Sequence, residues 1–403
     1  KEKNGVSYET GPNAILLSDV HVQNGSFANL AEFPVLQMFY RQGLIIPGHP
    51  NNTGRKPMLI GNEEQVRCQS EYIYRGNYGL TSEEELMAAG VDADTAREMM
   101  RLKLKFAFDR IMQTEELLDL KVVGDQPVEL NAGATVRRKA FNVYEFSHNG
   151  ESVTVDLNLA PGDHYDPPFQ LGFHEVNREY FSIVHTGEGD GWDINRPCMA
   201  SIIIFQGKIY LIDAGPNIHH ALTSLGISVN EIEGIFHTHA HDDHFAGLTC
   251  LVRSDHMIKY YATPLVRASV IKKFAALTDI EESSFSSYFE IHDLDFDDWN
   301  NIGGLEVKPL FSPHPVETSI MIFRALWEGG YKTYAHWADT VSFRVLDSMI
   351  TDDPQKNGVS REFFERIKNE YLEPVDIKKI DIGGGLIHGE AQDFENDTSG
   401  RII

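Results

Sequence analysis

The sequence predicts a two-part chain whose second part has an α/β fold. From about residue 180 to the C-terminus, strand-like and helix-like segments alternate, as they do in α/β proteins. Apolar runs such as SIIIF at 201–205 carry no charge and indicate buried strands. The preceding residues mix loops, a helical stretch and a β-hairpin, which predicts an additional N-terminal α+β region.

Three segments define the N-terminal region. Residues 1–80 are rich in Gly, Pro and Asn, and this composition predicts loops between short strands. Helical periodicity follows over 81–112, where Thr81 or Ser82 can act as N-cap and Gly90 divides the stretch into two helices. Alternation over 139–159 predicts a hairpin that turns at the letters HNG.

A stretch rich in Pro, Gly and Asp at 160–172 is the best linker candidate. We therefore expect an N-terminal α+β region of unknown role over 1–175 and an α/β domain over 176–403. In that domain SIIIF and KIYLIDA predict two strands joined by Gln206-Gly207. PNIHHALTSLGI predicts a short helix and GIFHT another strand, with further helices expected over 263–277, 342–351 and 360–372.

Composition excludes several functional classes. The 403 residues carry a formal charge of −25, so we expect no long nucleic acid as partner. The sequence lacks a transmembrane run and the apolar core of a signal peptide, so no membrane partner is expected. Its three widely spaced cysteines fit neither a disulfide framework nor a zinc knuckle, and indicate a cytoplasmic protein.

The run HTHAHDDH at 237–244 concentrates metal-binding side chains between a predicted strand and a predicted helix. Imidazole nitrogen and carboxylate oxygen are both ligands of divalent metals. Two registers compete. One is a trio of His237, His239 and His241, and the other is the HxHxDH set His239, His241, Asp243 and His244.

The second register resembles the central motif of the metallo-β-lactamase superfamily. The other elements of that family follow in order: Asp213 in YLIDAG, His314 in FSPHPVETS, Asp339 in HWADT and His388 in GGGLIHGE. The resemblance covers roughly residues 180–403. It implies an αββα sandwich, two mixed sheets packed face to face with helices outside and the metals at one edge.

The resemblance also implies a site for two divalent metal ions. His239, His241 and His314 would bind one ion, Asp243, His244 and His388 the second, and Asp339 would bridge them. Asp213 would support the loop, and His237 would point away. Zinc is the expected metal, with iron or manganese as alternatives.

The segment HTGEGDGWDINRPCMASIIIF and the element HPVETS resemble ribonuclease Z and related metal-dependent phosphodiesterases. Two features depart from that branch: Trp337-Ala338 precedes Asp339, which would place an indole near the site, and no long basic arm for transfer RNA is present. We therefore expect a small-molecule substrate, a phosphodiester such as a cyclic nucleotide.

The expected reaction is hydrolysis by a hydroxide that bridges the two metals. The candidate catalytic residues are Asp243, Glu317 and His336. Glu317 and His336 lie close in sequence to metal ligands and are candidates to supply a proton to the leaving group.

Two other functions stay open: a non-hydrolytic dimetal (diiron) sensor of oxygen or another ligand, and a thioester or lactone hydrolase. We also expect a homodimer and a possible regulatory domain beyond the C-terminus. Near the N-terminus, Asp19 and His21 form a D-x-H element that resembles calcineurin-like phosphoesterases, but the GNH element of that family lacks its His at IGNE.

Overall fold

The computed structural model describes residues 2, 3 and 5–403, and the chain forms two compact units. The first contains residues 1–77, 112–168 and 273–281, and the second contains residues 78–111, 169–272 and 282–403. The domain boundary expected at residue 175 stays a prediction. Each of the two units contains residues from both sides of that position. Among the described residues, none of the helices combines the length and apolar character that crossing a bilayer requires.

The second unit contains two six-stranded sheets. The first sheet has the order β12-β13-β14-β15-β16-β17, antiparallel up to β14 and parallel from there on. Its strands are β12 (Phe181–Gly187), β13 (Ala200–Phe205), β14 (Lys208–Ile212), β15 (Ile232–Phe236), β16 (Ile258–Ala262) and β17 (Phe289–Asp293).

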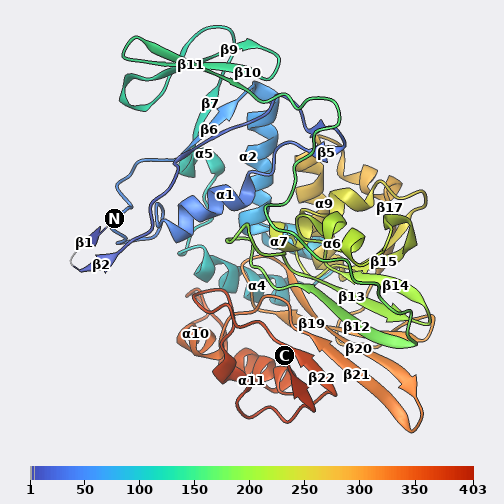
Figure 1. Cartoon of the computed structure of the whole chain (residues 1–403). Helices are drawn as coiled ribbons and strands as arrows, with labels where there is room; N and C mark the ends of the chain where they lie inside the picture. The colour runs from blue at the N-terminus through green and yellow to red at the C-terminus, as the bar shows by residue number, and fades with distance from the viewer. Residues whose placement is uncertain (1, 4) are drawn as a thin grey trace. The chain divides into compact units, whose positions relative to one another are not determined.

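The second sheet has the order β18-β19-β20-β21-β22-β23, and its last two pairings are parallel. Its strands are β18 (Asn300–Ile302), β19 (Leu305–Ser312), β20 (Thr318–Trp327), β21 (Gly330–His336), β22 (Ile377–Lys379) and β23 (Arg401–Ile402). Figure 1 shows the first sheet in green to gold and the second in orange to red.

The two sheets pack against each other through apolar side chains. Ile203 and Phe205 of β13 share one buried cluster with Met321 and Phe323 of β20. The alternate residues of β20, such as Ile322, face the opposite side and pack with helices α10 (Phe343–Ser348) and α11 (Arg361–Tyr371). Figure 1 shows α6 (Ile218–Ser224) and α7 (Asp242–Phe245) beside the first sheet. The predicted αββα sandwich is confirmed.

The predicted local elements are present. Helices α3 (Glu83–Ala88) and α4 (Ala93–Phe106) begin after Ser82, whose side chain caps α3, and are separated at Gly90. The turns at Asn149-Gly150 and Gln206-Gly207 have both residues in the left-handed region, as two-residue hairpins require. The remaining helical segments of this unit are α8 (Leu248–Leu251), η3 (Val229–Glu231), η4 (Glu282–Ser287) and η5 (Ala391–Phe394). Helix α9 (Pro264–Thr278) has residues in both units.

The first unit is built on a parallel sheet, β3-β6-β7, and a meander, β11-β10-β9-β8. Both contribute to one apolar cluster that includes Ile60 and Tyr144. The strands are β1 (Glu2–Lys3), β2 (Val6–Ser7), β3 (Ala14–Leu16), β4 (Val22–Gln23), β5 (Ser26–Phe27), β6 (Met58–Gly61), β7 (Asp119–Val122), β8 (Val128–Glu129), β9 (Thr135–Ala140), β10 (Val143–His148) and β11 (Glu151–Asp156). The helical segments are α1 (Glu32–Leu36), η1 (Gln37–Arg41), α2 (Glu63–Tyr78), α5 (Thr114–Leu117) and η2 (Asn131–Gly133).

Helix α2 corrects the prediction that residues 1–80 contain only loops and short strands. Its buried face carries polar residues, because Gln65 accepts a hydrogen bond from the Asn29 side chain and Gln69 accepts one from the Ala31 backbone. Because buried Gln side chains alternate there with apolar ones such as Val66 and Tyr72, the apolar periodicity from which helices are predicted is weakened.

Gly76 of α2 lies against a buried ion pair. Glu32 and Lys273 contact each other with both side chains fully buried, and Lys273 also lies over the ring of Tyr72. A Cβ on Gly76 would stand 2.0 Å from a carboxylate oxygen of Glu32. The helix therefore needs glycine at this position for space.

We predict that Gly76→Ala destabilises the protein by about 2 kcal/mol, because overpacking against the ion pair outweighs a helix-propensity gain of about 1 kcal/mol. Denaturant unfolding measures the change. Gly124→Ala is the matched control, since a Cβ there meets no atom within 4 Å. A Gly76→Ala protein as stable as the control variant would contradict the steric argument.

Candidate metal centre

The ligand candidates lie where strands of both sheets end. Asp213 follows β14, the run 237–244 follows β15 and enters α7, and His314 follows β19. Asp339 follows β21 and His388 follows β22. The structure therefore brings all seven predicted ligands to one edge of the sandwich.

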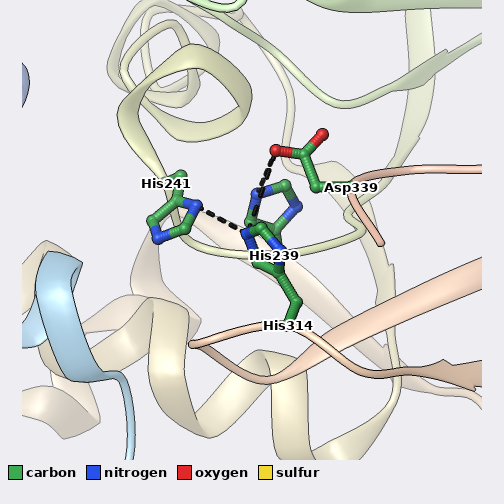
Figure 2. A group of neighbouring side chains, drawn as sticks. All are labelled: His239, His241, His314 and Asp339. Carbon is green, nitrogen blue, oxygen red and sulfur yellow. Dashed lines mark hydrogen bonds and ion pairs between the residues drawn. The ribbon is translucent and has the colours of Figure 1, made fainter. Parts of the chain in front are cut away.

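Asp339 is the common neighbour of four imidazoles. Its carboxylate oxygens lie 3.8 Å from His239 Nε2, 3.2 Å from His244 Nε2 and 3.9 Å from His314 Nε2. His388 Nδ1 is 3.6 Å away. Figure 2 shows Asp339 above the rings of His239 and His314, with His241 alongside. A carboxylate reached by ligands of both predicted sets has the position that a bridging ligand requires.

Asp213 sets the tautomer of two of these histidines. Its carboxylate accepts hydrogen bonds from the backbone NH and the hydroxyl of Thr238, and its Oδ2 lies 2.7 Å from His244 Nδ1. His244 Nδ1 therefore donates to Asp213, so Nε2 presents a lone pair to the site.

The Thr238 hydroxyl fixes the tautomer of a second ring, that of His239. Because this hydroxyl donates to Asp213, it accepts from His239 Nδ1, which lies 3.1 Å away. His239 Nε2 is thereby left unprotonated and faces the site. The expected supporting role of Asp213 agrees with this geometry.

His314 is oriented by backbone. Its Nδ1 lies 3.1 Å from the carbonyl oxygen of Ile387, which accepts the ring proton. Its Nε2 is 3.0 Å from His241 Nδ1, a spacing close to that of two nitrogens sharing one metal ion. The loops are held together by Ser312, whose hydroxyl donates to the Asp339 carbonyl.

Buried polar atoms of the cluster that form no hydrogen bonds indicate that it can hold a metal ion. Within the described part of the chain, His239 Nε2, His244 Nε2 and Asp243 Oδ1 are buried and accept or donate no hydrogen bond. Buried polar atoms are normally paired, and three unpaired atoms converging in one place indicate a missing partner. A cation satisfies two imidazole lone pairs and a carboxylate oxygen at once. The side chains can therefore hold metal.

The carboxylates of Asp243 and Asp339 differ in pKa. Burial raises the pKa of Asp243 to about 6. Burial acts in the same direction on Asp339, but the charge of His388 holds the pKa of Asp339 well below its usual value. Asp339 is therefore the carboxylate that stays ionised among the imidazoles.

Asp381 belongs to the site although the sequence analysis did not single it out. Its carboxylate accepts hydrogen bonds from the backbone of Thr340, Gly383 and Gly389, and lies 3.0 Å from His388 Nδ1. It groups with Asp339 and His388 as a possible ligand set. The signal available in the sequence was an Asp shortly after a strand, as Asp213 is after β14.

Glu317 and His336 lie in structural contacts. Glu317 pairs with buried Lys103 at 3.0 Å and accepts from the backbone NH of Leu80 at 2.9 Å. His336 Nδ1 lies 2.9 Å from the Tyr334 hydroxyl, and burial lowers the His336 pKa well below its usual value. These contacts do not favour either residue as a proton donor, and those two roles stay predictions.

Two further residues face away from the ligands. His237 Nδ1 lies 3.0 Å from the hydroxyl of Tyr260, as expected for a packed histidine. Trp337 is fully buried between Tyr371 and Phe394 in the core beneath α11. The indole, which the sequence was expected to place near the site, packs in this apolar cluster instead.

Comparison with known proteins gives a partial match. The family profile described as "Anti-Pycsar protein Apyc1" matches residues 181–326. The chain is 22% identical over 229 residues to the cGMP-dependent 3′,5′-cGMP phosphodiesterase A of Dictyostelium discoideum, a match that covers 55% of this chain and 26% of that relative. The chain thus spans about a quarter of that relative's length.

Similar solved structures include the metallo-β-lactamase fold protein YhfI of Bacillus subtilis, with 14% identity, 55% of this chain and 83% of that chain covered, and a TM-score of 0.39. The short form of human tRNase Z is also 14% identical, with 55% and 90% covered and a TM-score of 0.38.

We predict that Asp339→Ala loses about one of two bound metal ions, because the remaining ligands cannot offset two facing cations. Elemental analysis of the purified protein measures the content. His237→Ala is the control and should keep its metal while losing stability through the Tyr260 contact. Full metal content in Asp339→Ala, or metal loss in His237→Ala, would show that the ligand register is wrong.

We predict that Asp381→Asn weakens binding of one metal ion by about 10–100-fold, the usual effect of removing a carboxylate that orients a histidine ligand. Competition with a chromogenic chelator measures the affinity. Asp397→Asn, on the same C-terminal segment, changes a carboxylate that pairs with Lys378 instead and should leave metal affinity unchanged. Equal affinities in the Asp381 variant and the wild type would remove Asp381 from the site.

Proposed function

Since the second unit has the metallo-β-lactamase fold, we propose that this chain is a metal-dependent hydrolase of small phosphodiesters such as cyclic nucleotides. The observation that carries the proposal is the position of Asp339 among four imidazoles that belong to two ligand sets. A pair of divalent ions, when bound, supplies a nucleophile at neutral pH and neutralises charge on the phosphoryl oxygens.

The protein's own side chains prepare such a centre. Asp213 and Thr238 hold the rings of His239 and His244 with Nε2 inward. Because hydrogen bonds fix the rings before metal arrives, little reorganisation is needed on binding. Seven ligands with one shared carboxylate support two ions, and zinc is the proposed metal.

The open side of the centre supports a substrate with an apolar part. The His388 side chain is 15% exposed, whereas those of His239, His244 and His314 are fully buried. Ile382 and Leu386, in the loop that leads to His388, are more than half exposed. They offer an apolar surface beside the most accessible ligand, suited to the base of a nucleotide.

Charge and relatives support the substrate class. A surface with a formal charge of −25 disfavours long polyanions, so the substrate is small. The Dictyostelium relative is named as a phosphodiesterase of 3′,5′-cGMP, and its similarity supports a cyclic phosphodiester for this chain. The choice among nucleobases is left to experiment.

We predict that the zinc-loaded protein cleaves bis(p-nitrophenyl) phosphate and 3′,5′-cyclic nucleotides. Hydroxyacyl thioesters, lactones and β-lactams should react slowly or not at all. Release of nitrophenol and chromatography of the nucleotide products measure turnover, with zinc, manganese and iron tested in parallel. Asp339→Ala should reduce phosphodiester turnover by at least about 100-fold if the centre is responsible.

Other results of this assay would support one of the two alternative functions. Turnover confined to thioesters or lactones would replace the phosphodiester proposal with an acyl hydrolase at the same centre. A fully metallated protein that turns over none of these substrates, and whose iron form has an oxygen-sensitive visible absorption band, would instead be a diiron sensor.

A further inference from the structure

Three metal-ligating side chains gather in the first unit, outside the centre described above, and a fourth, Glu64, contacts one of them. His21, Cys68 and Asp279 each place a ligand atom within 4.8 Å of the others. The carboxylate of Glu64 lies 3.1 Å from His21 Nε2. Sulfur, imidazole and carboxylate are the three ligand types of zinc sites.

Three separate segments supply these side chains. Glu64 and Cys68 are four residues apart on one face of α2. His21 lies between β3 and β4, and Asp279 follows the end of α9 with a left-handed φ of 53°. The cluster thus joins parts of the chain that are distant in sequence.

The contacts of His21 fix the orientation of its ring. Its Nδ1 lies 3.1 Å from the carbonyl oxygen of Leu277, which can only accept, so Nδ1 carries the proton. The other ring nitrogen, Nε2, lies 3.1 Å from the Glu64 carboxylate. It is the nitrogen that a metal ion would bind.

Local charge is consistent with a divalent ion. A metallated site would hold the anions of Glu64, Cys68 and Asp279 against two positive charges. The guanidinium of Arg67, 2.8 Å from Asp279, supplies the third. The Cys68 side chain is buried, so its sulfur is shielded from competing ligands.

We propose that His21, Glu64, Cys68 and Asp279 form a second, structural site for one zinc-type divalent ion. All four ligands come from the protein, the arrangement of a structural site rather than a catalytic one. The site would tie the β3–β4 loop and the end of α9 to helix α2 within the first unit. It is independent of the proposed hydrolase activity.

Binding displaces one proton. Burial raises the pKa of the Cys68 thiol to about 11, so the metal-free side chain is a neutral thiol. The ion binds sulfur as the S–H bond breaks, the electron pair stays on sulfur and the proton leaves to solvent. The oxidation states of sulfur and metal do not change.

The neighbouring Asp19 takes no part. Its carboxylate accepts hydrogen bonds from Arg138, Tyr144 and the backbone of Asn142. The two residues of the D-x-H element therefore have different roles. Asp19 belongs to a hydrogen-bond network, and His21 is a proposed metal ligand. A calcineurin-like site is not formed there.

The test loads the full-length protein with Co²⁺, whose bond to a thiolate produces charge-transfer absorption in the near ultraviolet. We expect this absorption in the wild type and in Asp339→Ala, and its loss in Cys68→Ser. Cys250→Ser and Cys198→Ser are the matched controls and should keep it. Elemental analysis of the zinc protein should show about one ion per chain fewer in Cys68→Ser than in Cys250→Ser.

His21→Ala separates the metal site from a simple ion pair between His21 and Glu64. With a metal site, this variant weakens the cobalt–thiolate absorption and lowers zinc affinity by at least about 10-fold. The proposal is overturned if the wild type shows no thiolate absorption, or if the Cys68→Ser or His21→Ala protein keeps both the absorption and the metal content of the controls.

Discussion

The carboxylate of Asp213 is the interaction on which the candidate centre depends. It sits in a left-handed conformation at the end of β14, with φ of 62°, which Asp tolerates better than most residues. From there it accepts from Thr238 and His244 together. A change to Asn would replace one acceptor oxygen with a donor and disturb both rings at once.

The second constraint is the burial of charge. Asp243, Asp339 and His244 are almost completely inaccessible to solvent. Burying ionised groups costs several kcal/mol unless partners offset it, and a misplaced charge here would unfold the edge of the sandwich. Imidazoles around Asp339 provide part of that offset and cations would provide the rest. The proposed metal centre would therefore account for the burial of these groups.

The α/β fold class could be predicted from local pattern, because apolar runs indicate strands. The convergence of the ligands was predicted from the resemblance of HTHAHDDH and the later elements to the metallo-β-lactamase motifs. Helix α2 was not predicted, because Gln65 and Gln69 interrupt the apolar pattern of its buried face. The pairing of Glu317 with Lys103 was equally hidden, since it joins residues far apart in the sequence. Such pairings exist only after folding.

The distribution of the ligands over both sheets has a mechanical consequence. His239 and His244 follow a strand of the first sheet, whereas His314, Asp339 and His388 follow strands of the second. A metal ion bound by both groups would cross-link distant segments of the chain. Cross-links that close long loops restrict the unfolded ensemble most. The two sheets would then be held together at one edge by the metal centre and along their faces by apolar packing. Without ions, that edge would be held by apolar packing and by hydrogen bonds such as the one from the Ser319 backbone NH to the Thr238 carbonyl oxygen.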